Sequence, residues 1–372
     1  MSLNIRVIPV SSSRVQEVDF ENLVFGRQFS DHMFVADYAD GKWQDARIVP
    51  FGNFEIHPAT MALHYGQAVF EGMKASKAVD GTPMLYRPED HARRINRSCD
   101  RMMMPHFPED TFVEALHLLV GMDQQWIPPM EGSALYLRPF MFATDPFVGV
   151  RPSSSYKFII FTCPVGPYYP RPVKLLAETD YIRAAVGGVG EAKAAGNYAA
   201  AMLPTKIAQD NGYDQVIWLD AKERKYVQEV GTMNIFFQIG DKVVTPTTDG
   251  AILRGITRDS AMQILKDKGF EVEVRPVAIE EIIEAGKNGT LNACFGTGTA
   301  VVVSYVEEIR YRDQVVRLPE ISDDNPGKVV KSTINGLRAG TIEDSYGWTV
   351  RVEQPRLNGS TNEVTAGLSG VK

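Results

Sequence analysis

The sequence contains few residues of the kinds that build disulfide-stabilised or metal-binding domains. Its 372 residues include three cysteines, Cys99, Cys163 and Cys294, which are too few and too widely separated for a disulfide framework. The six histidines are scattered, and none forms a ligand pair such as His-Glu-x-x-His. We therefore expect free, buried thiols in a reducing compartment and no metal site.

An excess of positive charge and long apolar segments are also missing. The net charge of −7 provides no basic surface for nucleic acid. No segment approaches the roughly 18 apolar residues that a membrane-spanning helix needs. The N-terminal residues lack the apolar core of a secretory signal, and acidic residues appear by Glu17. These features predict a cytoplasmic protein that binds neither nucleic acid nor membranes.

The composition is that of an ordinary globular enzyme, with 44% hydrophobic and 23% charged residues, and the length suits two domains. Residues 164–172 contain four prolines, which cannot continue a helix or a sheet. We therefore predict a smaller N-terminal domain over residues 1–163 and a connector over 164–173. A larger C-terminal domain is expected over 174–352, followed by a polar, flexible tail over 353–372.

The hydrophobic periodicity predicts both strands and helices in each half of the chain, which indicates a mixed α/β (α+β) fold. The expected strands are 32–39, 46–50, 133–142, 156–163, 215–219, 234–238, 271–275, 291–295 and 300–306. The expected helices are 89–103, 109–122, 198–209, 257–268, 279–285 and 327–340.

Two segments point to chemistry at a bound cofactor. Lys193 lies among glycines and alanines in GGVGEAKAAGNY (187–198), where small neighbours let a cofactor approach the amine closely. A neutral lysine can form a Schiff base with a carbonyl. Glu229, in QEVGTMN (228–234), is a candidate partner for a pyridine nitrogen. Nucleotide binding is disfavoured for two reasons. Gly188-Val189-Gly190 is not followed by the third glycine of the dinucleotide-binding fingerprint, and the second glycine cluster (296–300) precedes a strand rather than a helix.

Several further segments, taken in order, resemble the branched-chain amino acid aminotransferases, which are fold-type IV pyridoxal phosphate enzymes. The matching segments are FGRQFSDHM (25–33), LHYGQAVFEGMK (63–74), YRP (86–88) with Arg94, LYLRP (135–139), the Lys193 and Glu229 segments, GITR (255–258) and GTGTA (296–300). The resemblance implies the two-domain fold-type IV architecture, pyridoxal 5'-phosphate as cofactor and a homodimer. It also implies small-molecule substrates, with the amino group of L-leucine, L-isoleucine or L-valine transferred reversibly to 2-oxoglutarate.

The resemblance also implies a role for particular residues. Lys193 would carry the cofactor and move a proton, Glu229 would keep the pyridine nitrogen protonated, and Tyr198 would contact the cofactor's phenolic oxygen. The residues implied to bind the phosphate are Arg94, Ile256, Thr257 and Thr299. Those implied to bind the substrate are Tyr65, Phe70, Tyr136, Arg138, Thr299 and Ala300, with Phe25 or Phe29 as a further aromatic wall.

Other functions remain possible at this point. A D-amino acid aminotransferase or an aminodeoxychorismate lyase of the same fold would use the same lysine and glutamate, although Tyr136 and Arg138 favour the branched-chain group. A non-catalytic protein that kept the cofactor-binding scaffold is a second alternative. Mammalian members carry a redox-active Cys-x-x-Cys where this chain has Val301 and Ser304, so that disulfide switch is not expected here.

Overall fold

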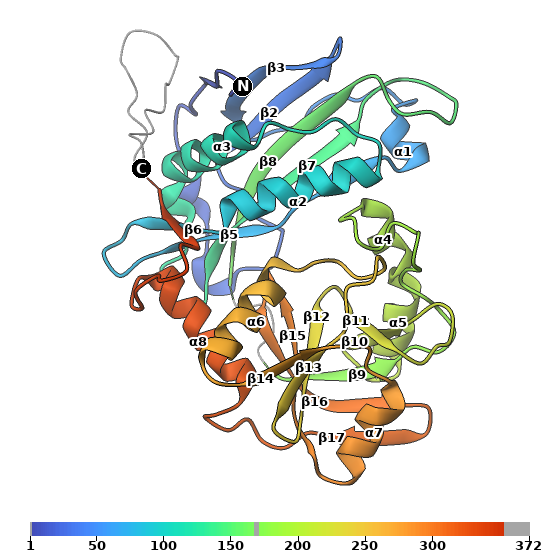
Figure 1. Cartoon of the computed structure of the whole chain (residues 1–372). Helices are drawn as coiled ribbons and strands as arrows, with labels where there is room; N and C mark the ends of the chain where they lie inside the picture. The colour runs from blue at the N-terminus through green and yellow to red at the C-terminus, as the bar shows by residue number, and fades with distance from the viewer. Residues whose placement is uncertain (1, 167–170, 353–372) are drawn as a thin grey trace. The chain divides into compact units, whose positions relative to one another are not determined.

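The computed structural model describes residues 2–166 and 171–352, and the chain forms two compact units (Figure 1). One unit comprises Met1–Tyr168 with Leu337–Lys372, and the other comprises Tyr169–Gly336. The division falls within the predicted connector 164–173, of which residues 167–170 lie outside the described residues. The predicted tail, 353–372, also lies outside them.

The first unit is built on a nine-stranded sheet with the order β1-β3-β2-β8-β7-β5-β6-β18, and β4 pairs with β7. Only β1 and β3 run parallel among these pairs; the others are antiparallel. The strands are β1 (Arg6–Val7), β2 (His32–Ala39), β3 (Lys42–Pro50), β4 (Ala68–Phe70), β5 (Met73–Lys77), β6 (Pro83–Tyr86), β7 (Ala134–Ala143), β8 (Tyr156–Val165) and β18 (Thr349–Arg351).

Two helices, α2 (Pro88–Arg101) and α3 (Glu109–Met122), pack against each other and cover this sheet, with α3 on β2 and α2 on β4 (Figure 1). Proline at the first position of α2 suits a helix start, since its missing N–H has no partner there anyway. Apolar residues at helical spacing face the core, where the rings of Phe107 and Phe158 stack 3.9 Å apart. The shorter elements are α1 (Met61–Tyr65) and the 3-10 turns Val15–Glu17, Phe20–Asn22 and Gln124–Trp126.

The second unit has its own nine-stranded sheet, in the order β11-β10-β9-β16-β15-β12-β13-β14, with β17 paired to β16. This sheet is mixed, because β9 runs parallel to β10 and β16, and β13 runs parallel to β14. The strands are β9 (Val173–Ala177), β10 (Gln215–Leu219), β11 (Val227–Val230), β12 (Asn234–Ile239), β13 (Lys242–Thr245), β14 (Glu271–Val274), β15 (Leu291–Gly298), β16 (Val302–Tyr311) and β17 (Gln314–Arg317).

Helices pack on this second sheet at several places. The helix α6 (Ile256–Asp267) contacts β14 and β15, α7 (Ile279–Lys287) contacts β15 and β17, and α5 (Met202–Asp210) contacts β10. The helix expected over 198–209 is in fact two, α4 (Ala195–Ala200) and α5, which meet at Ala201. Pro204 lies in the first turn of α5, where its ring is tolerated, and it would disrupt the interior of one continuous helix.

The structure places residues 337–352 in the first unit, whereas the sequence pattern assigned them to the C-terminal domain. The helix α8 (Pro326–Ala339) crosses the division, and the backbone N–H of Val79 donates to the carbonyl of Ala339 at 3.0 Å. Strand β18 then pairs antiparallel with β6. A three-residue edge strand has too short an alternating pattern to be assigned from sequence, so this return of the chain was not foreseen.

Two searches of the described residues gave negative results. Within residues 2–166 and 171–352, no helix is long and apolar enough to cross a membrane. Over the same ranges, no group of three or more histidine, cysteine or carboxylate side chains could hold a metal ion.

Candidate active site

Lys193 lies just before α4 in the second unit, and its amine is directed at a tyrosine. Its Nζ donates a hydrogen bond to the hydroxyl of Tyr198 at 2.8 Å and lies 5.3 Å from the centre of that ring. The five-residue separation allows this contact because Lys193 stands in an irregular segment while Tyr198 stands on the helix. The two predicted residues are therefore brought together.

The loop that leads to Lys193 is fixed by its neighbours. The side-chain amide of Asn197 donates to the carbonyls of Val189 and Ala192, both at 2.9 Å. A Cβ at Gly190 would lie 2.3 Å from the carbonyl oxygen of Ala251, so only glycine lets these two loops approach so closely. The loop that carries the lysine is therefore held in place by these hydrogen bonds and by its close packing against the loop at Ala251.

Glu229 lies on β11 with only 4% of its surface exposed. Its Oε1 accepts hydrogen bonds from the backbone N–H of Leu253 at 2.9 Å and from the side-chain amide of Asn234 at 3.3 Å. Its Oε2 lies 3.0 Å from Nε of Arg183 in a buried ion pair. Burial raises the pKa of Glu229, and the charges of Arg183 and, to a smaller extent, Lys193 oppose that rise.

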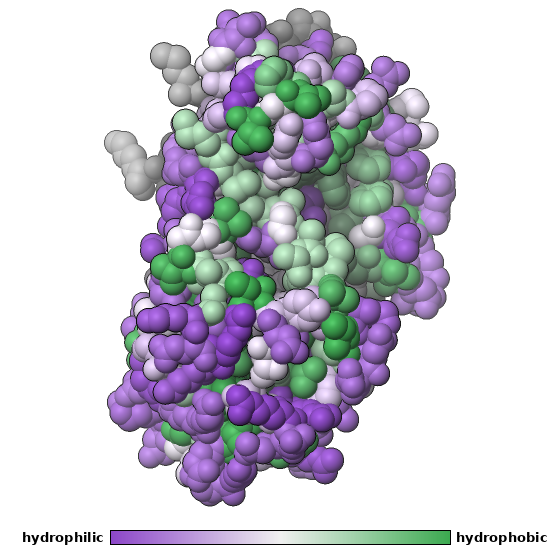
Figure 2. Space-filling model, turned by 90° about the vertical axis from the view of Figure 1, so that its right-hand side faces the viewer, coloured by the Kyte–Doolittle hydropathy of each residue, from purple (hydrophilic) through white to green (hydrophobic). Residues whose placement is uncertain are grey.

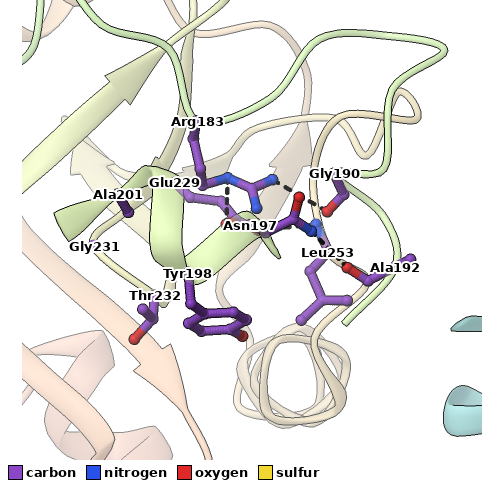
Figure 3. Close-up of a pocket in the computed structure, with 10 residues that line it drawn as sticks. All are labelled: Arg183, Gly190, Ala192, Asn197, Tyr198, Ala201, Glu229, Gly231, Thr232 and Leu253. Atoms are coloured by element: carbon purple, nitrogen blue, oxygen red, sulfur yellow. Dashed lines mark hydrogen bonds and ion pairs between the residues drawn. The ribbon is translucent and has the colours of Figure 1, made fainter. Parts of the chain in front are cut away.

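Tyr198, Glu229 and Arg183 border an open pocket with about 370 Å³ of empty space, and Figure 3 shows the Arg183 side chain directed at Glu229. The pocket is lined by Arg183, Gly190, Ala192, Asn197, Tyr198, Ala201, Glu229, Gly231, Thr232 and Leu253.

The helix α6 begins at Ile256, three residues after Leu253, whose backbone N–H bonds Glu229. Gly255 precedes it without any side-chain cap, and Ile256 and Thr257 are buried in its first turn. A Cβ at Gly255 would lie 1.9 Å from Oδ1 of Asn234, so glycine is required for this close approach. The N-terminal turn of a helix carries backbone N–H groups and positive dipole charge, which together favour a phosphate.

Thr299 and Ala300 lie in the turn between β15 and β16, and α6 packs on β15. The turn is strained, because Val302 has a φ of +62°, which is unusual for a β-branched residue. Thr297, two residues before Thr299, is paired with Asn234 where β12 and β15 lie side by side. Both side chains therefore lie on the same face of the sheet. The hydroxyl of Thr297 is buried and has no hydrogen-bond partner among the described residues.

Arg94 stands on α2 in the first unit, and its guanidinium is held by a buried glutamate. Its Nε and NH2 donate to the two oxygens of Glu71 at 2.7 and 2.8 Å, and Nδ1 of His91 lies 2.8 Å from Oε2 of the same carboxylate. Burial tends to raise the pKa of Glu71, but Arg94 and His91 more than offset this and hold it well below its usual range.

The remaining predicted substrate residues form an aromatic and cationic cluster in the first unit. The hydroxyl of Tyr136 accepts a hydrogen bond from NH2 of Arg138 at 3.0 Å, and the guanidinium of Arg138 lies 4.8 Å from the ring centre of Phe70. Phe25 contacts Tyr136 edge to face, with ring centres 5.3 Å apart. A Cβ at Gly72 would lie 2.1 Å from the Tyr136 hydroxyl, so this glycine makes room for the phenol.

Tyr65 lies apart from these contacts. It ends α1, is 39% exposed and stacks at an angle on His64, with ring centres 4.3 Å apart. The structure thus places Arg94, Tyr65, Phe70, Tyr136 and Arg138 in the first unit, and Lys193, Tyr198, Glu229, Ile256, Thr257, Thr299 and Ala300 in the second.

The sequence analysis missed Arg183, Asn197, Asn234 and Thr297 as contributors to the site. Arg183 stands in no quoted motif, and Thr297 fell inside GTGTA (296–300), where Thr299 was expected to bind the phosphate instead. Asn197 and Asn234 fell inside quoted motifs, but their bonds to Ala192, Val189, Leu253 and Glu229 depend on how the loops fold.

Known proteins resemble this chain over most of its length. Residues 68–309 match the family described as amino-transferase class IV. The chain is 45% identical over 349 residues to branched-chain-amino-acid aminotransferase 2 of Bacillus subtilis, covering 93% of this chain and 96% of that protein. It is 48% identical to a probable branched-chain-amino-acid aminotransferase of Staphylococcus epidermidis, covering 92% and 96% respectively.

A solved structure agrees with these relatives. The crystal structure of the Escherichia coli branched-chain amino acid aminotransferase superposes with a TM-score of 0.72 at 26% identity, covering 87% of this chain and 99% of that one. The predicted mixed α/β fold of fold-type IV is thereby confirmed.

The residues present fit the cofactor of this family, pyridoxal 5'-phosphate. Lys193 offers an amine for its carbonyl, and the buried Glu229 offers a carboxylate for its ring nitrogen. The first turn of α6 and the buried hydroxyl of Thr297, which has no hydrogen-bond partner within residues 2–166 and 171–352, suit its phosphate. The fold, the donor set and the relatives agree, and the chain belongs to the class IV aminotransferases and, within them, to the family of branched-chain-amino-acid aminotransferases.

Proposed function

We propose that this protein transfers the amino group of L-leucine, L-isoleucine or L-valine reversibly to 2-oxoglutarate, giving the branched-chain 2-oxo acid and L-glutamate. The observation that carries the proposal is the 2.8 Å contact between Lys193 and Tyr198 next to the buried Glu229, in a chain whose relatives are named for this activity.

Bound pyridoxal phosphate supplies a carbonyl for the substrate amine and a ring that withdraws electrons from the substrate α-carbon. Lys193 would hold the cofactor through Nζ, and the same amine, once released, would move the proton of the substrate α-carbon. Tyr198 fixes the direction of that amine through its hydroxyl. Glu229 would accept a hydrogen bond from the ring nitrogen of the cofactor, and its negative charge would favour the protonated ring.

The phosphate ligands are proposed to be Arg94, Ile256, Thr257 and Thr299. The start of α6 supports Ile256 and Thr257, because helix N-termini bind phosphate through backbone N–H groups. Arg94 is supported by its bidentate contact with Glu71, which fixes the plane of the guanidinium and leaves its positive charge in a buried environment.

The substrate residues are proposed to be Tyr65, Phe70, Tyr136, Arg138, Thr299 and Ala300. Nε of Arg138 is buried and has no hydrogen-bond partner among the described residues, which suits a carboxylate acceptor. The rings of Phe70 and Tyr136 flank that guanidinium and would provide apolar walls for an aliphatic side chain. Discrimination among three such side chains by single methylenes is worth only about 1–3 kcal/mol.

A homodimer is proposed as the working assembly. Exposed apolar side chains gather where the 51–60 loop and α1 meet the 144–153 loop, which the Thr60–Pro146 bridge joins: Phe54, Ile56, Leu63, Phe147, Val148 and Val150. Hydrophobic surface is also visible among the hydrophilic residues in Figure 2. Such patches on a soluble protein favour association. Val148→Asp should weaken the dimer measured by light scattering, whereas Val79→Asp, at an exposed valine elsewhere, should not.

The cytoplasm is proposed as the location. Cys99, Cys163 and Cys294 are all free and buried. Burial raises the pKa of Cys99 to about 12 and that of Cys163 to about 11, so these thiols stay protonated and unreactive at neutral pH. Thiol labelling of the folded protein should therefore be slow, and rapid labelling would argue against this assignment.

The test of the function is the absorption spectrum of the purified holoprotein before and after addition of L-leucine, with D-alanine in parallel. Conversion of the cofactor band by L-leucine alone, with appearance of the 2-oxo acid, supports the proposal. Conversion by D-alanine alone would favour a D-amino acid aminotransferase, and release of pyruvate from aminodeoxychorismate would favour the lyase. Absence of a cofactor band, even after incubation with pyridoxal phosphate, would indicate a non-catalytic scaffold.

A further inference from the structure

Arg183 connects three segments of the second unit that meet at the pocket. Its Nε forms the ion pair with Oε2 of Glu229 on β11. Its NH2 donates to the carbonyl of Gly190, in the loop before Lys193, at 3.3 Å, and to the carbonyl of Ala251, in the loop before α6. Only 9% of the side chain is exposed. The guanidinium therefore ties the glutamate to the loops that carry the lysine and the start of α6 (Figure 3).

The two oxygens of Glu229 are used differently. Oε1 already accepts two hydrogen bonds, from Leu253 and Asn234. Oε2 lies close to Arg183, yet the Nε–H is not directed along a hydrogen bond to it, and Nε has no hydrogen-bond partner among the described residues. Oε2 is thus compensated in charge while still able to accept a hydrogen bond from one further donor.

We propose that Arg183 is a positioning residue that keeps Glu229 ionised and presents its Oε2 to the protonated ring nitrogen of the cofactor. The inference rests on the proposed role of Glu229. Arg183 itself does not touch the cofactor in this assignment; it acts through the carboxylate and through the two carbonyls that fix its own plane. The contribution of Arg183 to cofactor binding should therefore depend on the presence of a nitrogen in the cofactor ring.

The electrostatic environment of the carboxylate agrees with this role. Burial raises the pKa of Glu229, and Arg183 is the group that opposes the rise most strongly, ahead of the backbone N–H of Leu253. Without this cation the carboxyl would bind a proton more readily, and a neutral carboxyl no longer stabilises a cationic ring. An arginine suits the position better than a lysine, because its planar fork meets acceptors on three segments at once.

The test uses apo-protein and two ligands, pyridoxal phosphate and its carbocyclic analogue in which the ring nitrogen is replaced by C–H. Both ligands keep the aldehyde and the phosphate, so only the nitrogen differs. Dissociation constants are measured by absorption titration for wild type, Arg183→Met, Arg183→Lys and Glu229→Gln. Arg258→Met is the graded comparison, since Arg258 is also buried and bonds Thr245 and Pro246, and its charge acts on Glu229 more weakly than that of Arg183.

Wild type should bind pyridoxal phosphate more tightly than the analogue, and Arg183→Met should reduce this preference by on the order of tenfold or more. Arg183→Lys should restore part of it, and Arg258→Met should reduce the preference by a smaller factor than Arg183→Met does, because its charge acts more weakly on Glu229. If Arg183→Met weakened both ligands equally, Arg183 would have only a structural role and the proposal would be overturned.

The Glu229→Gln protein separates failure of this inference from failure of the proposed site. Loss of the preference in Glu229→Gln with its retention in Arg183→Met would overturn the role of Arg183 alone. Retention of the preference in Glu229→Gln would overturn the assignment of Glu229 to the ring nitrogen, and the inference with it. If Arg183→Met does not fold, Arg183→Lys carries the test, and an unchanged preference in that variant would overturn the proposal.

Discussion

Each unit contains a deeply buried glutamate beside an arginine, and the two carboxylates differ in how their charge is compensated. Glu71 receives two hydrogen bonds from Arg94 and a third contact from His91, and its pKa is lowered. Glu229 has an ion pair with Arg183 that is not a hydrogen bond, and its pKa is raised. Burial raises the pKa of both carboxylates, and only at Glu71 do the partners more than offset that rise.

The difference shows what each carboxylate is suited to do. Glu71 is fully compensated within its own unit, and its function there is to hold the guanidinium of Arg94 in place. Glu229 is incompletely compensated, and a site in that condition gains from the arrival of a cation. A protonated pyridine ring is such a cation. The geometry of the two pairs, rather than their residue types, separates a supporting carboxylate from a binding one.

The largest expected effect is a loss of stability when Glu71 is replaced. Glu71→Gln leaves Arg94 in a buried environment without its counter-charge, which costs about 3–5 kcal/mol of unfolding free energy. Glu229→Gln also removes the counter-charge of the buried Arg183, but it should cost the apo-protein less, because Arg183 keeps its hydrogen bonds to the carbonyls of Gly190 and Ala251 and because burial already raises the pKa of Glu229. Urea unfolding of both apo-variants at pH 7 checks this, and equal losses would remove the distinction.

The next effect is on catalysis, and it should fall on Glu229. Glu229→Gln should lower the single-turnover rate with L-leucine by on the order of 10²- to 10³-fold, since the charge that stabilises the cationic ring is lost. Glu71→Gln should raise the concentration of pyridoxal phosphate needed for saturation but recover most of its rate once saturated. A Glu71→Gln protein that stayed slow at saturating cofactor would contradict the supporting role assigned to Glu71.

Much of this molecule was predictable from its sequence where the pattern is long and local. The helix expected over 109–122 is confirmed as α3 (Glu109–Met122), and the strand expected over 32–39 is confirmed as β2, because both are long enough for their periodicity to repeat. Strands such as β4 and β18, with three residues each, repeat no pattern and were missed. They form because β7 and β6, respectively, pair with them through backbone hydrogen bonds.

The same limit applies to the site. Lys193 and Tyr198 share one short segment, and both were predicted as cofactor residues; the hydrogen bond between them was not predicted. Arg183, Glu229 and Ala251 come together only after the sheet and its loops have formed, so no local spacing could reveal the ion pair or the carbonyl contacts. Glu71 was visible within a motif, but its bond to Arg94 depends on how α2 packs in the first unit.

A smaller effect is expected at Asn234, whose side chain donates to Oε1 of Glu229. Its amide bonds both Glu229 and the carbonyl of Leu253, and Asn234→Leu would leave these buried acceptors with fewer donors. The expected loss is about 1–3 kcal/mol of unfolding free energy. Asn292→Leu is the matched control, since its bond to the carbonyl of Gly240 is exposed and should contribute about 1 kcal/mol or less. Equal losses would show that Asn234 has no special part.

The smallest expected effect is the dependence of stability on pH, and it has opposite signs for the two glutamates. The folded pKa of Glu71 is lowered, so its contribution is present above the ordinary value of 4.5 and is lost as the pH falls toward the folded value. The folded pKa of Glu229 is raised, so its contribution is present below 4.5 and is lost as the pH rises through the folded value.

Glutamine does not titrate, so the two variants isolate these contributions. Apo-wild type should lose stability relative to Glu229→Gln as the pH rises above 4.5, with a slope of at most about 1.4 kcal/mol per pH unit. The deficit of Glu71→Gln should instead shrink as the pH falls below 4.5. Bound pyridoxal phosphate should remove the first slope, because a cationic ring lowers the pKa of Glu229, and leave the second. The free energy of unfolding should be measured across this pH range with and without cofactor. If the stability differences for Glu229→Gln and Glu71→Gln changed with pH in the same direction, the contrast between the two glutamates would be wrong.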